Sequence, residues 1–187
     1  MPPVTGTHRT RRTARLRLEP IGPERENDLY RLHRDPGIAR WYGAWSTEDA
    51  RAAAAAMGRA WRTEGIHKWL AYERGTGELI GRGGLSLAEV DGARRLEIGW
   101  AVREALWGRG YASEIGREGV ACAFGELGAT ELVSFTETRN ARSRAVMERL
   151  GFHHTRDIRH ADDDFALYTL RPHEDGGPRK PPRHRCS

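Results

Sequence analysis

The sequence has few cysteines and no long apolar run. Its 187 residues include two cysteines. Cys122 lies in an apolar helical stretch and Cys186 is the penultimate residue of a proline-rich tail, so a disulfide framework is excluded. The longest apolar stretches are too short to cross a bilayer, and the N-terminus lacks the pattern of a secretory signal. We therefore expect a cytoplasmic protein without a membrane partner.

The central part of the chain also lacks an excess of either charge. The net charge of +5 comes from the ends, since residues 1–13 carry +3 and residues 172–187 carry +2, while residues 14–171 hold 24 basic and 24 acidic residues. A basic face for nucleic acid is therefore not implied, and such contacts would be weak and confined to the tails. We expect a disordered basic tail over 1–13, one domain over 14–171 and a disordered Pro/Gly/basic tail over 172–187.

The order of the predicted elements indicates a mixed sheet with helices on its faces, an α/β (α+β) domain. Alternating and apolar runs between turn residues predict the strands, and helical spacing with N-terminal and C-terminal signals predicts the helices. In chain order we expect strand 14–19, helix 24–34, helix 46–61, strands 68–73, 79–87 and 95–102, a helix up to 127, strand 131–136, helix 140–150, and strands 152–159 and 164–171.

Two glycines, Gly108 and Gly110, lie between a predicted strand and the first turn of a helix. Such a loop can direct backbone N–H groups at a phosphate, with the helix dipole and Arg109 adding positive potential. A dinucleotide-binding loop would need glycine where Ser113 stands, and the Gly-Lys-Ser/Thr of a P-loop is absent. An ordinary glycine-containing connection remains the alternative.

Residues 107–112 read WGRGYA, and Asn140, Ser143 and the run LGF at 150–152 follow about thirty residues later. These two motifs, in this order, resemble those of the GNAT superfamily of acetyl-CoA-dependent N-acetyltransferases. The segment Trp107–Ala112 matches Gln/Arg-x-x-Gly-x-Gly/Ala with tryptophan in the first position, as in the ribosomal-protein alanine N-acetyltransferase branch. Asn140, Ser143 and the run 150–152 (LGF) resemble the second motif. The resemblance implies a mostly antiparallel sheet splayed between the fourth and fifth predicted strands. It also implies acetyl-CoA as the acetyl donor, with homodimers common among relatives.

The resemblance further implies which residues bind the donor. The pantetheine arm would pair with backbone at Trp100, Ala101 and Val102. The remaining expected donor-binding residues are Trp107, Gly108, Arg109, Gly110, Tyr111, Ala112, Ser113 and Asn140. A gap between parallel strands suits this arm because it offers unpaired amides to an extended ligand.

Acetyl transfer to an amine needs a base for the nitrogen and stabilisation of the departing thiolate. The resemblance implies Glu97 as the base, through a water, although an edge-strand carboxylate is the alternative. Many relatives have a tyrosine acid where this chain has Met147, which cannot donate a proton. Ser143 would then be the donor or a thiol contact, unless positioning alone suffices.

The aromatic residues Trp41, Tyr42, Trp45 and Trp69 are candidates for the acceptor pocket, with core packing as the alternative, and we expect one or two of them to face substrate. A metal site is not expected. His153 and His154 would point to opposite faces of a strand, and the acids of 162–164 are typical of a solvated turn near His160.

The sequence therefore predicts an N-acetyltransferase that moves an acetyl group from acetyl-CoA to a primary amine within a ternary complex. The acceptor is either a protein N-terminus or a small-molecule amine. The alternative from another class is a non-catalytic acyl-CoA sensor or interaction protein of the same fold. Motifs identify the donor much better than the acceptor.

Overall fold

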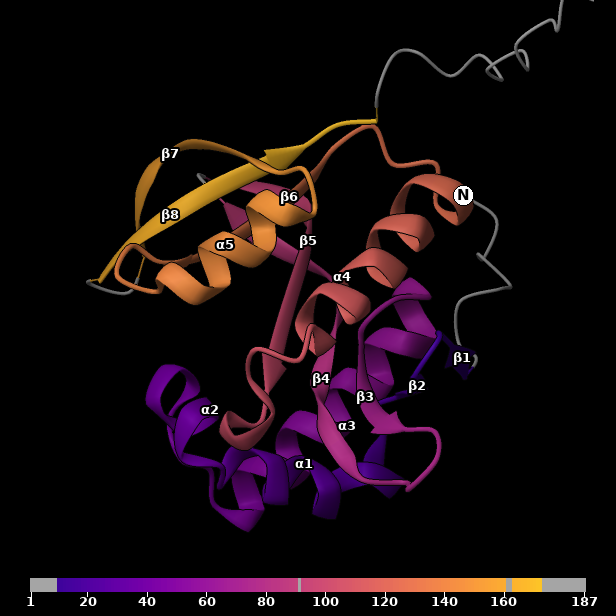
Figure 1. The fold of residues 1–187 in the computed structure, drawn as a ribbon. Helices are drawn as coiled ribbons and strands as arrows, with labels where there is room; N and C mark the ends of the chain where they lie inside the picture. Colours follow the sequence, from indigo (N-terminus) through magenta and orange to yellow (C-terminus); the bar gives the residue numbers. More distant parts are fainter. Residues whose placement is uncertain (1–9, 91, 161–162, 173–187) are drawn as a thin grey trace, which may run out of the picture.

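A computed structural model describes residues 10–90, 92–160 and 163–172 of the chain (Figure 1). The helices are α1 (Glu26–His33), α2 (Pro36–Tyr42), α3 (Thr47–Glu64), α4 (Tyr111–Ala121) and α5 (Ala141–Arg149), with helical turns η1 (Pro23–Arg25), η2 (Glu104–Leu106) and η3 (Cys122–Glu126). The strands are β1 (Arg11–Arg12), β2 (Leu16–Pro20), β3 (Lys68–Glu73), β4 (Leu79–Val90), β5 (Ala93–Val102), β6 (Leu132–Glu137), β7 (His153–His160) and β8 (Asp163–Leu170).

The strands form one sheet in the order β1-β2-β3-β4-β5-β6-β8-β7. All neighbours are antiparallel except β5 and β6, which run parallel and share a single residue pair, Glu97 with Val133. The predicted mixed, mostly antiparallel sheet is confirmed, and the splay falls between the strands over 95–102 and 131–136 as expected.

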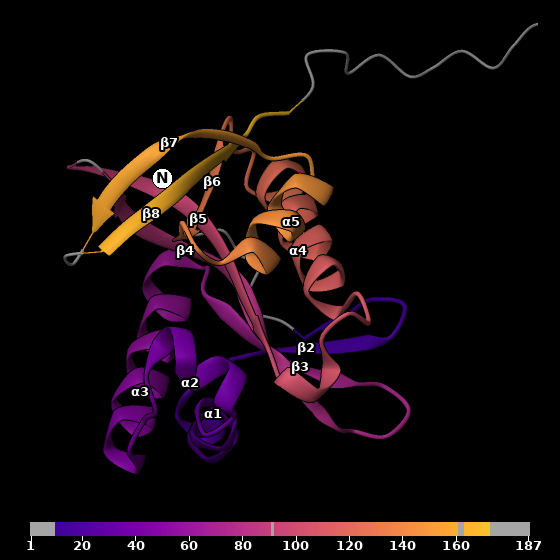
Figure 2. The ribbon, with the colours of Figure 1, turned by 60° about the vertical axis from the view of Figure 1, so that its left-hand side comes forward.

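Helices cover both faces of the sheet, with α1–α3 on one side and α4 and α5 on the other (Figure 2). The alternation along β5 shows which residues face which helices. Ile98, Trp100 and Val102 pack in one apolar cluster with Ile115 of α4. Ala101 belongs to the second cluster, with residues of α1, α2 and α3. Even-numbered β5 residues thus face α4, and odd-numbered ones face α1–α3.

Helix α2 was not expected, because Pro36 was read only as the end of the preceding helix. Proline also suits the first turn of a new helix, where its missing N–H has no partner to lose. Asp35 caps this helix by accepting a hydrogen bond from the N–H of Gly37 at 3.1 Å. The predicted aromatic cluster therefore has Trp41 and Tyr42 on the last turn of α2.

Part of the segment expected as a disordered tail over 1–13 is folded. Residues 1–9 lie outside the described part of the chain, as do 173–187. Arg11 and Arg12 form β1, paired with β2. The guanidinium of Arg11 is buried and lies 3.0 Å from Glu118 and 2.6 Å from Glu126, beyond the sheet on α4 and η3. Arg11 and Arg12 thus belong to the sheet although they precede residue 14, and the sequence did not indicate this because an isolated arginine pair carries no strand signal.

Candidate functional site

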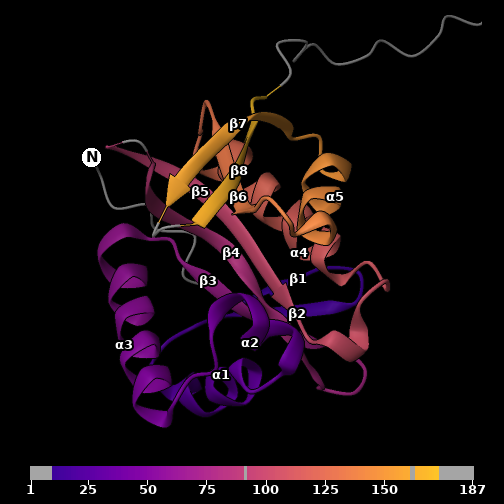
Figure 3. The same ribbon diagram turned by 90° about the vertical axis from the view of Figure 1, so that its left-hand side faces the viewer.

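Strands β5 and β6 separate at the centre of the sheet (Figure 3). Beside the single Glu97–Val133 pair, the hydroxyl of Ser134 donates to the carbonyl of Ile98 at 2.8 Å. Beyond Ile98 no residue of β5 has a partner on β6 within the described sheet. An opening therefore begins at Gly99 and widens toward Val102.

Along β5, the backbone N–H and C=O groups of successive residues point alternately to β4 and to the opening. The N–H of Arg103 donates to Ile80 of β4, so odd-numbered residues turn their backbone groups to β4. Ala101 therefore does so too, which contradicts its expected pairing with a ligand in the opening. The backbone groups of Trp100 and Val102 therefore point to the opening. Their carbonyls accept from the hydroxyl of Tyr42 at 3.3 Å and from the indole of Trp107 at 2.8 Å, while their N–H groups stay directed at the opening.

The glycine loop between η2 and α4 lies at one end of the opening. Gly108 and Gly110 have φ of +77° and +80°, a region that favours glycine, and Gly110 is the N-cap of α4. The first N–H groups of a helix have no partner within it, so Tyr111, Ala112 and Ser113 offer amides toward the loop. This is the geometry in which a pyrophosphate fits.

Arg15, the residue before strand β2, contacts the glycine loop and the first turn of α4. Its guanidinium lies 2.9 Å from the carbonyl of Arg109, 2.7 Å from Glu114 and 4.4 Å from the centre of the Tyr111 ring. Burial acts to raise the pKa of Glu114, but hydrogen bonds from Thr13 and Arg15 outweigh it and lower that pKa. The charged carboxylate therefore anchors the first turn of α4.

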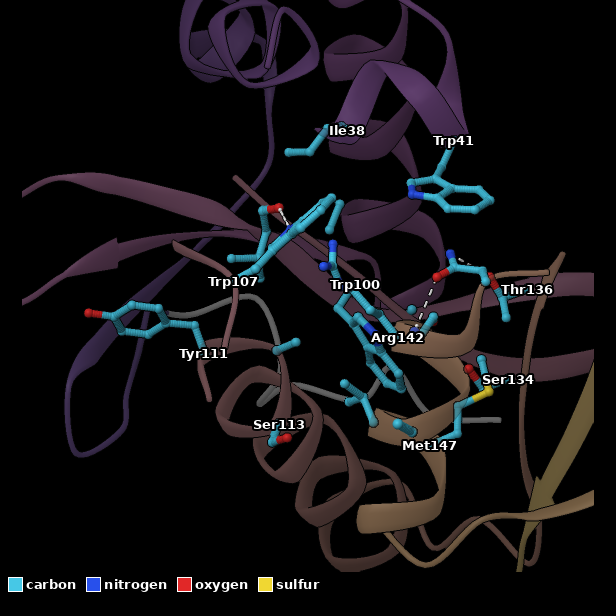
Figure 4. A pocket seen from close by; sticks show the side chains of 18 of the residues that line it. Ile38, Trp41, Trp100, Trp107, Tyr111, Ser113, Ser134, Thr136, Arg142 and Met147 are labelled. Carbon is cyan, nitrogen blue, oxygen red and sulfur yellow. Dashed lines mark hydrogen bonds between the residues drawn. The ribbon is translucent and has the colours of Figure 1, made fainter. Parts of the chain in front are cut away.

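Helix α5 lies across the opening from the loop. Asn140 caps α5 by accepting from the N–H of Ser143 at 3.2 Å, and its amide donates to Thr136 at 3.1 Å. Figure 4 shows these bonds together with Arg142, whose guanidinium lies 4.4 Å from the centre of the Trp107 ring. Asn140 thus acts first as a helix cap that fixes where α5 begins beside the opening.

A cavity of about 1210 Å³ passes through the opening and reaches both faces of the sheet. On the α4–α5 face it is lined by the glycine loop, Ser113, Asn140, Ser143 and Met147. On the α1–α3 face it is lined by residues of α2 and of strands β3 to β6, among them Trp41, Tyr42, Lys68, Arg82, Ser86 and Glu97. Figure 4 shows Trp41 on one side of it, with Ser113 and Met147 on the other.

Three predicted residues do not line the cavity. Trp69 is 1 % exposed and packs against Trp61 with Arg11 above its ring. Trp45 stacks on His33 with ring centres 3.4 Å apart. Arg109 contributes its carbonyl to Arg15 instead of its charge to the cavity. Two of the four aromatic candidates, Trp41 and Tyr42, remain at the site, and the other two follow the core-packing alternative.

Glu97 lies on the α1–α3 face in a network with two neighbours. Its Oε2 accepts from Lys68 Nζ at 2.6 Å and from Ser86 Oγ at 2.7 Å. Lys68 is 7 % exposed and also donates to the carbonyl of Gly84 at 2.9 Å. Burial lowers the pKa of Lys68, and the Glu97 carboxylate opposes that shift. The second oxygen, Oε1, has no hydrogen bond within the described chain, which leaves it available to the cavity.

The sequence reasoning missed Lys68, which contacts Glu97, and Arg82, which lines the same face of the cavity. The sequence did contain a signal for them. Side chains alternate between the two faces of a sheet, so every second residue of a neighbouring strand shares the face of Glu97. Arg82, Gly84 and Ser86 pair with Ala101, Gly99 and Glu97. Polar side chains in strands that are otherwise apolar or glycine-rich mark a face that is not only core.

No metal site was predicted, and within the described residues no group of three or more His, Cys, Asp or Glu side chains is placed to hold a metal. His154 lies 2.8 Å from Asp157. The His160 side chain and Asp162 lie outside the described part of the chain. No helix among the described residues is long and apolar enough to span a membrane.

The fold and the site combine a cavity that opens between two splayed strands, a glycine loop at a helix N-terminus on one face of the sheet, and polar side chains on the other face. Comparison with known proteins supplies the family. The family model described as "Acetyltransferase (GNAT) domain" matches residues 15–153. The chain belongs to the GNAT acetyltransferase family, and is thus an acyltransferase with acetyl-CoA as cosubstrate.

Individual relatives agree with this family. The FsC-acetyl coenzyme A-N(2)-transacetylase of Aspergillus fumigatus is 34% identical over 155 residues, which cover 78% of this chain but 65% of that protein. An acetyltransferase structure from Agrobacterium tumefaciens is 26% identical, with a TM-score of 0.74, over 88% of this chain and 95% of the other. The ribosomal-protein-S5-alanine acetyltransferase of Vibrio fischeri has a TM-score of 0.74 at 12% identity, over 91% and 100% of the two chains, a likeness of fold alone.

Proposed function

We propose that this protein transfers an acetyl group from acetyl-CoA to a primary amine within a ternary complex. The observation that carries the proposal is the single cavity that joins both faces of the sheet through the β5–β6 opening. The glycine loop and Ser143 line it on one face, and Glu97 lines it on the other. The two reactants can therefore meet at the opening from opposite sides. The name of the Aspergillus relative, an N(2)-transacetylase, supports nitrogen as the acceptor atom.

The donor half holds the cosubstrate with backbone groups. Acetyl-CoA supplies a thioester whose carbonyl carbon the amine nitrogen attacks. The N–H groups of Trp100 and Val102 would bind the amide-containing arm, and those of Tyr111, Ala112 and Ser113 the pyrophosphate. Arg142 and Arg117 line this half and add positive charge for the phosphates.

The acceptor half handles the proton. Glu97 Oε1 would accept the proton that the amine loses, directly or through one water, while Lys68 and Ser86 hold the carboxylate in place through Oε2. As the carbon–sulfur bond breaks, the thiolate needs a donor, and Ser143 lies on the donor side of the same cavity. Met147 is 1 % exposed and offers no proton.

A non-catalytic acyl-CoA sensor is the second candidate. The observation in its favour is Met147 in the position where the resemblance places a tyrosine acid. Calorimetric titration with acetyl-CoA, followed by thiol release against amines and N-terminal peptides, separates the two. We expect binding together with thiol release for one acceptor class. Binding without release on any amine would favour the sensor, and absence of binding would contradict the assignment of the glycine loop.

A further inference from the structure

Arg82 of β4 is a buried arginine that lines the acceptor side of the cavity. Its side chain faces α1–α3, and the residue is 7 % exposed. Its Nε donates to Nε2 of His33 at 3.1 Å, and Tyr42 covers the guanidinium at 4.7 Å from Cζ to the ring centre. Among residues 10–90, 92–160 and 163–172 no carboxylate lies within 4.0 Å of this guanidinium, and its two terminal nitrogens have no acceptor.

A buried guanidinium without a carboxylate beside it is unusual. Buried charges in proteins are as a rule paired, because removal of an ion from water without a counter-charge is strongly unfavourable. Other buried basic groups here obey that rule, since Arg11 pairs with two glutamates and Lys68 with Glu97. Arg82 departs from it at the wall of a cavity, which is where a ligand can bring the counter-charge.

The neighbours of Arg82 do not neutralise it. His33 is fully buried, and burial together with the positive charge of Arg82 lowers its pKa to about 3, so the imidazole is neutral. The nearest acid along the sheet face, Glu97, is already matched by Lys68. At the cavity mouth Arg40 and Arg139 flank Trp41, with guanidinium carbons 5.6 and 5.7 Å from its ring, and Arg139 is paired with Glu137 at 2.6 Å.

We propose that Arg82 binds a carboxylate of the acceptor, so that the acceptor is an amine that also carries an anionic group. The inference rests on the proposed function. The guanidinium forms a bidentate pair with a carboxylate through its two free terminal nitrogens, a geometry that arginine favours. Polycationic amines such as aminoglycosides and polyamines are repelled by the same wall.

The shape of the wall fits such an acceptor. Arg82, Gly84 and Ser86 succeed one another on the same face of β4, so the positions of Arg82 and Ser86 are about 13 Å apart along the strand. Gly84 and Gly99 pair between them and bring no side chain. The space over Gly99 holds Glu97 Oε1 and Lys68 Nζ, which a Cβ there would meet at 2.8 and 3.4 Å. An amine near Glu97 and a carboxylate near Arg82 would therefore lie along the cavity wall that both residues line, beside the opening to the donor.

The test uses pairs of acceptors that differ only in charge. ω-Amino acids from β-alanine to 6-aminohexanoate, and the L-amino acids, are compared with their carboxamides in thiol release under saturating acetyl-CoA. Each pair is also titrated calorimetrically into the CoA-saturated protein. The wild type is expected to prefer the acid, in KM or Kd, by about 10- to 100-fold. Arg82→Gln is expected to remove that preference while acetyl-CoA affinity stays unchanged.

Two further variants keep the result interpretable. Arg82→Lys retains the charge but not the bidentate fork, and we expect an intermediate preference. Arg59→Gln removes an equal charge from the exposed side of α3 and is expected to behave as wild type. Equal KM or Kd values for acids and amides in the wild type would overturn the inference while the proposed function stands. If none of the amines causes thiol release, the proposed function is contradicted. The calorimetric titrations would then still decide whether Arg82 selects an anionic ligand.

Discussion

The two halves of the cavity are built from different kinds of atoms. The half proposed for the donor, called here the donor half, offers backbone N–H groups, from β5 at the splay and from the first turn of α4 behind two glycines of positive φ. The half proposed for the acceptor, the acceptor half, offers side chains, above all Glu97, Lys68 and Arg82, that come from three strands. A backbone site depends on a short stretch of local conformation, whereas a side-chain site depends on how distant segments pair. Variants in each half should therefore separate donor binding from acceptor chemistry.

The largest separation is expected from Glu97→Gln. Loss of the base should lower kcat by about 10²- to 10⁴-fold, with acetyl-CoA affinity unchanged because the donor half is untouched. The measurements are thiol release and calorimetry on the same preparation. Glu89→Gln, at an exposed position of β4 outside the cavity, is the matched control. Equal rates for Glu97→Gln and wild type would break the assignment of proton transfer to the acceptor half.

The stability of the fold around the donor half should depend on the N-terminal segment. Deletion of residues 1–13 removes the ion pairs of Arg11 and the 2.5 Å hydrogen bond from Thr13 to Glu114 at the start of α4. We expect a loss of about 3 kcal/mol in the free energy of unfolding, because Glu118 and Glu126 lose a buried partner. Denaturant unfolding measures it. Deletion of residues 1–9 alone is the control and should preserve stability, acetyl transfer and donor affinity.

A smaller effect is expected at low pH, through the scaffold of the acceptor half. His33 has a pKa of about 3 when folded and about 6.5 when unfolded, so between these values the unfolded chain binds more protons. Stability from this group is complete above pH 6.5 and falls as the pH drops, by about 2 kcal/mol at pH 5. His33→Gln should flatten the dependence of unfolding free energy on pH. An unchanged slope would show that His33 does not link protonation to folding.

The smallest expected effect concerns the glycine loop. Gly110→Ala should weaken acetyl-CoA binding about tenfold, since a side chain would crowd the pyrophosphate and the φ of +80° disfavours alanine. Gly77→Ala is a matched control, with φ of +75° and open space around a new Cβ, outside the cavity. Both should lose similar stability, but only the first should lose donor affinity. Equal affinities would contradict a backbone donor half.

Particular elements show how far sequence reasoning reached. Ser46 and Asp49 signalled the start of α3, and the structure has both reciprocal bonds of the capping box there. The strand around Glu97 and the loop at Gly108 and Gly110 were predicted because periodicity and glycine spacing are local. The helix after Asp35 was missed because the same dipeptide ends one helix and begins the next. Trp69 stayed open between the pocket and the core, since an aromatic side chain suits both, and the structure buries it in the core.

By itself the sequence predicted most of the helices and strands and the glycine loop, because backbone conformation and helix starts follow from neighbouring residues, while the splay of the sheet came from the family resemblance. Only the tertiary structure decided what faces the acceptor. Lys68 and Arg82 carry no motif, and they share a cavity wall with Glu97 because β3 pairs with β4 and β4 pairs with β5. Tyr42 reaches the same wall only because α2 packs on it. Charges that meet through such non-local pairing are decided by the fold, because burial and counter-charge exist only once the strands are side by side.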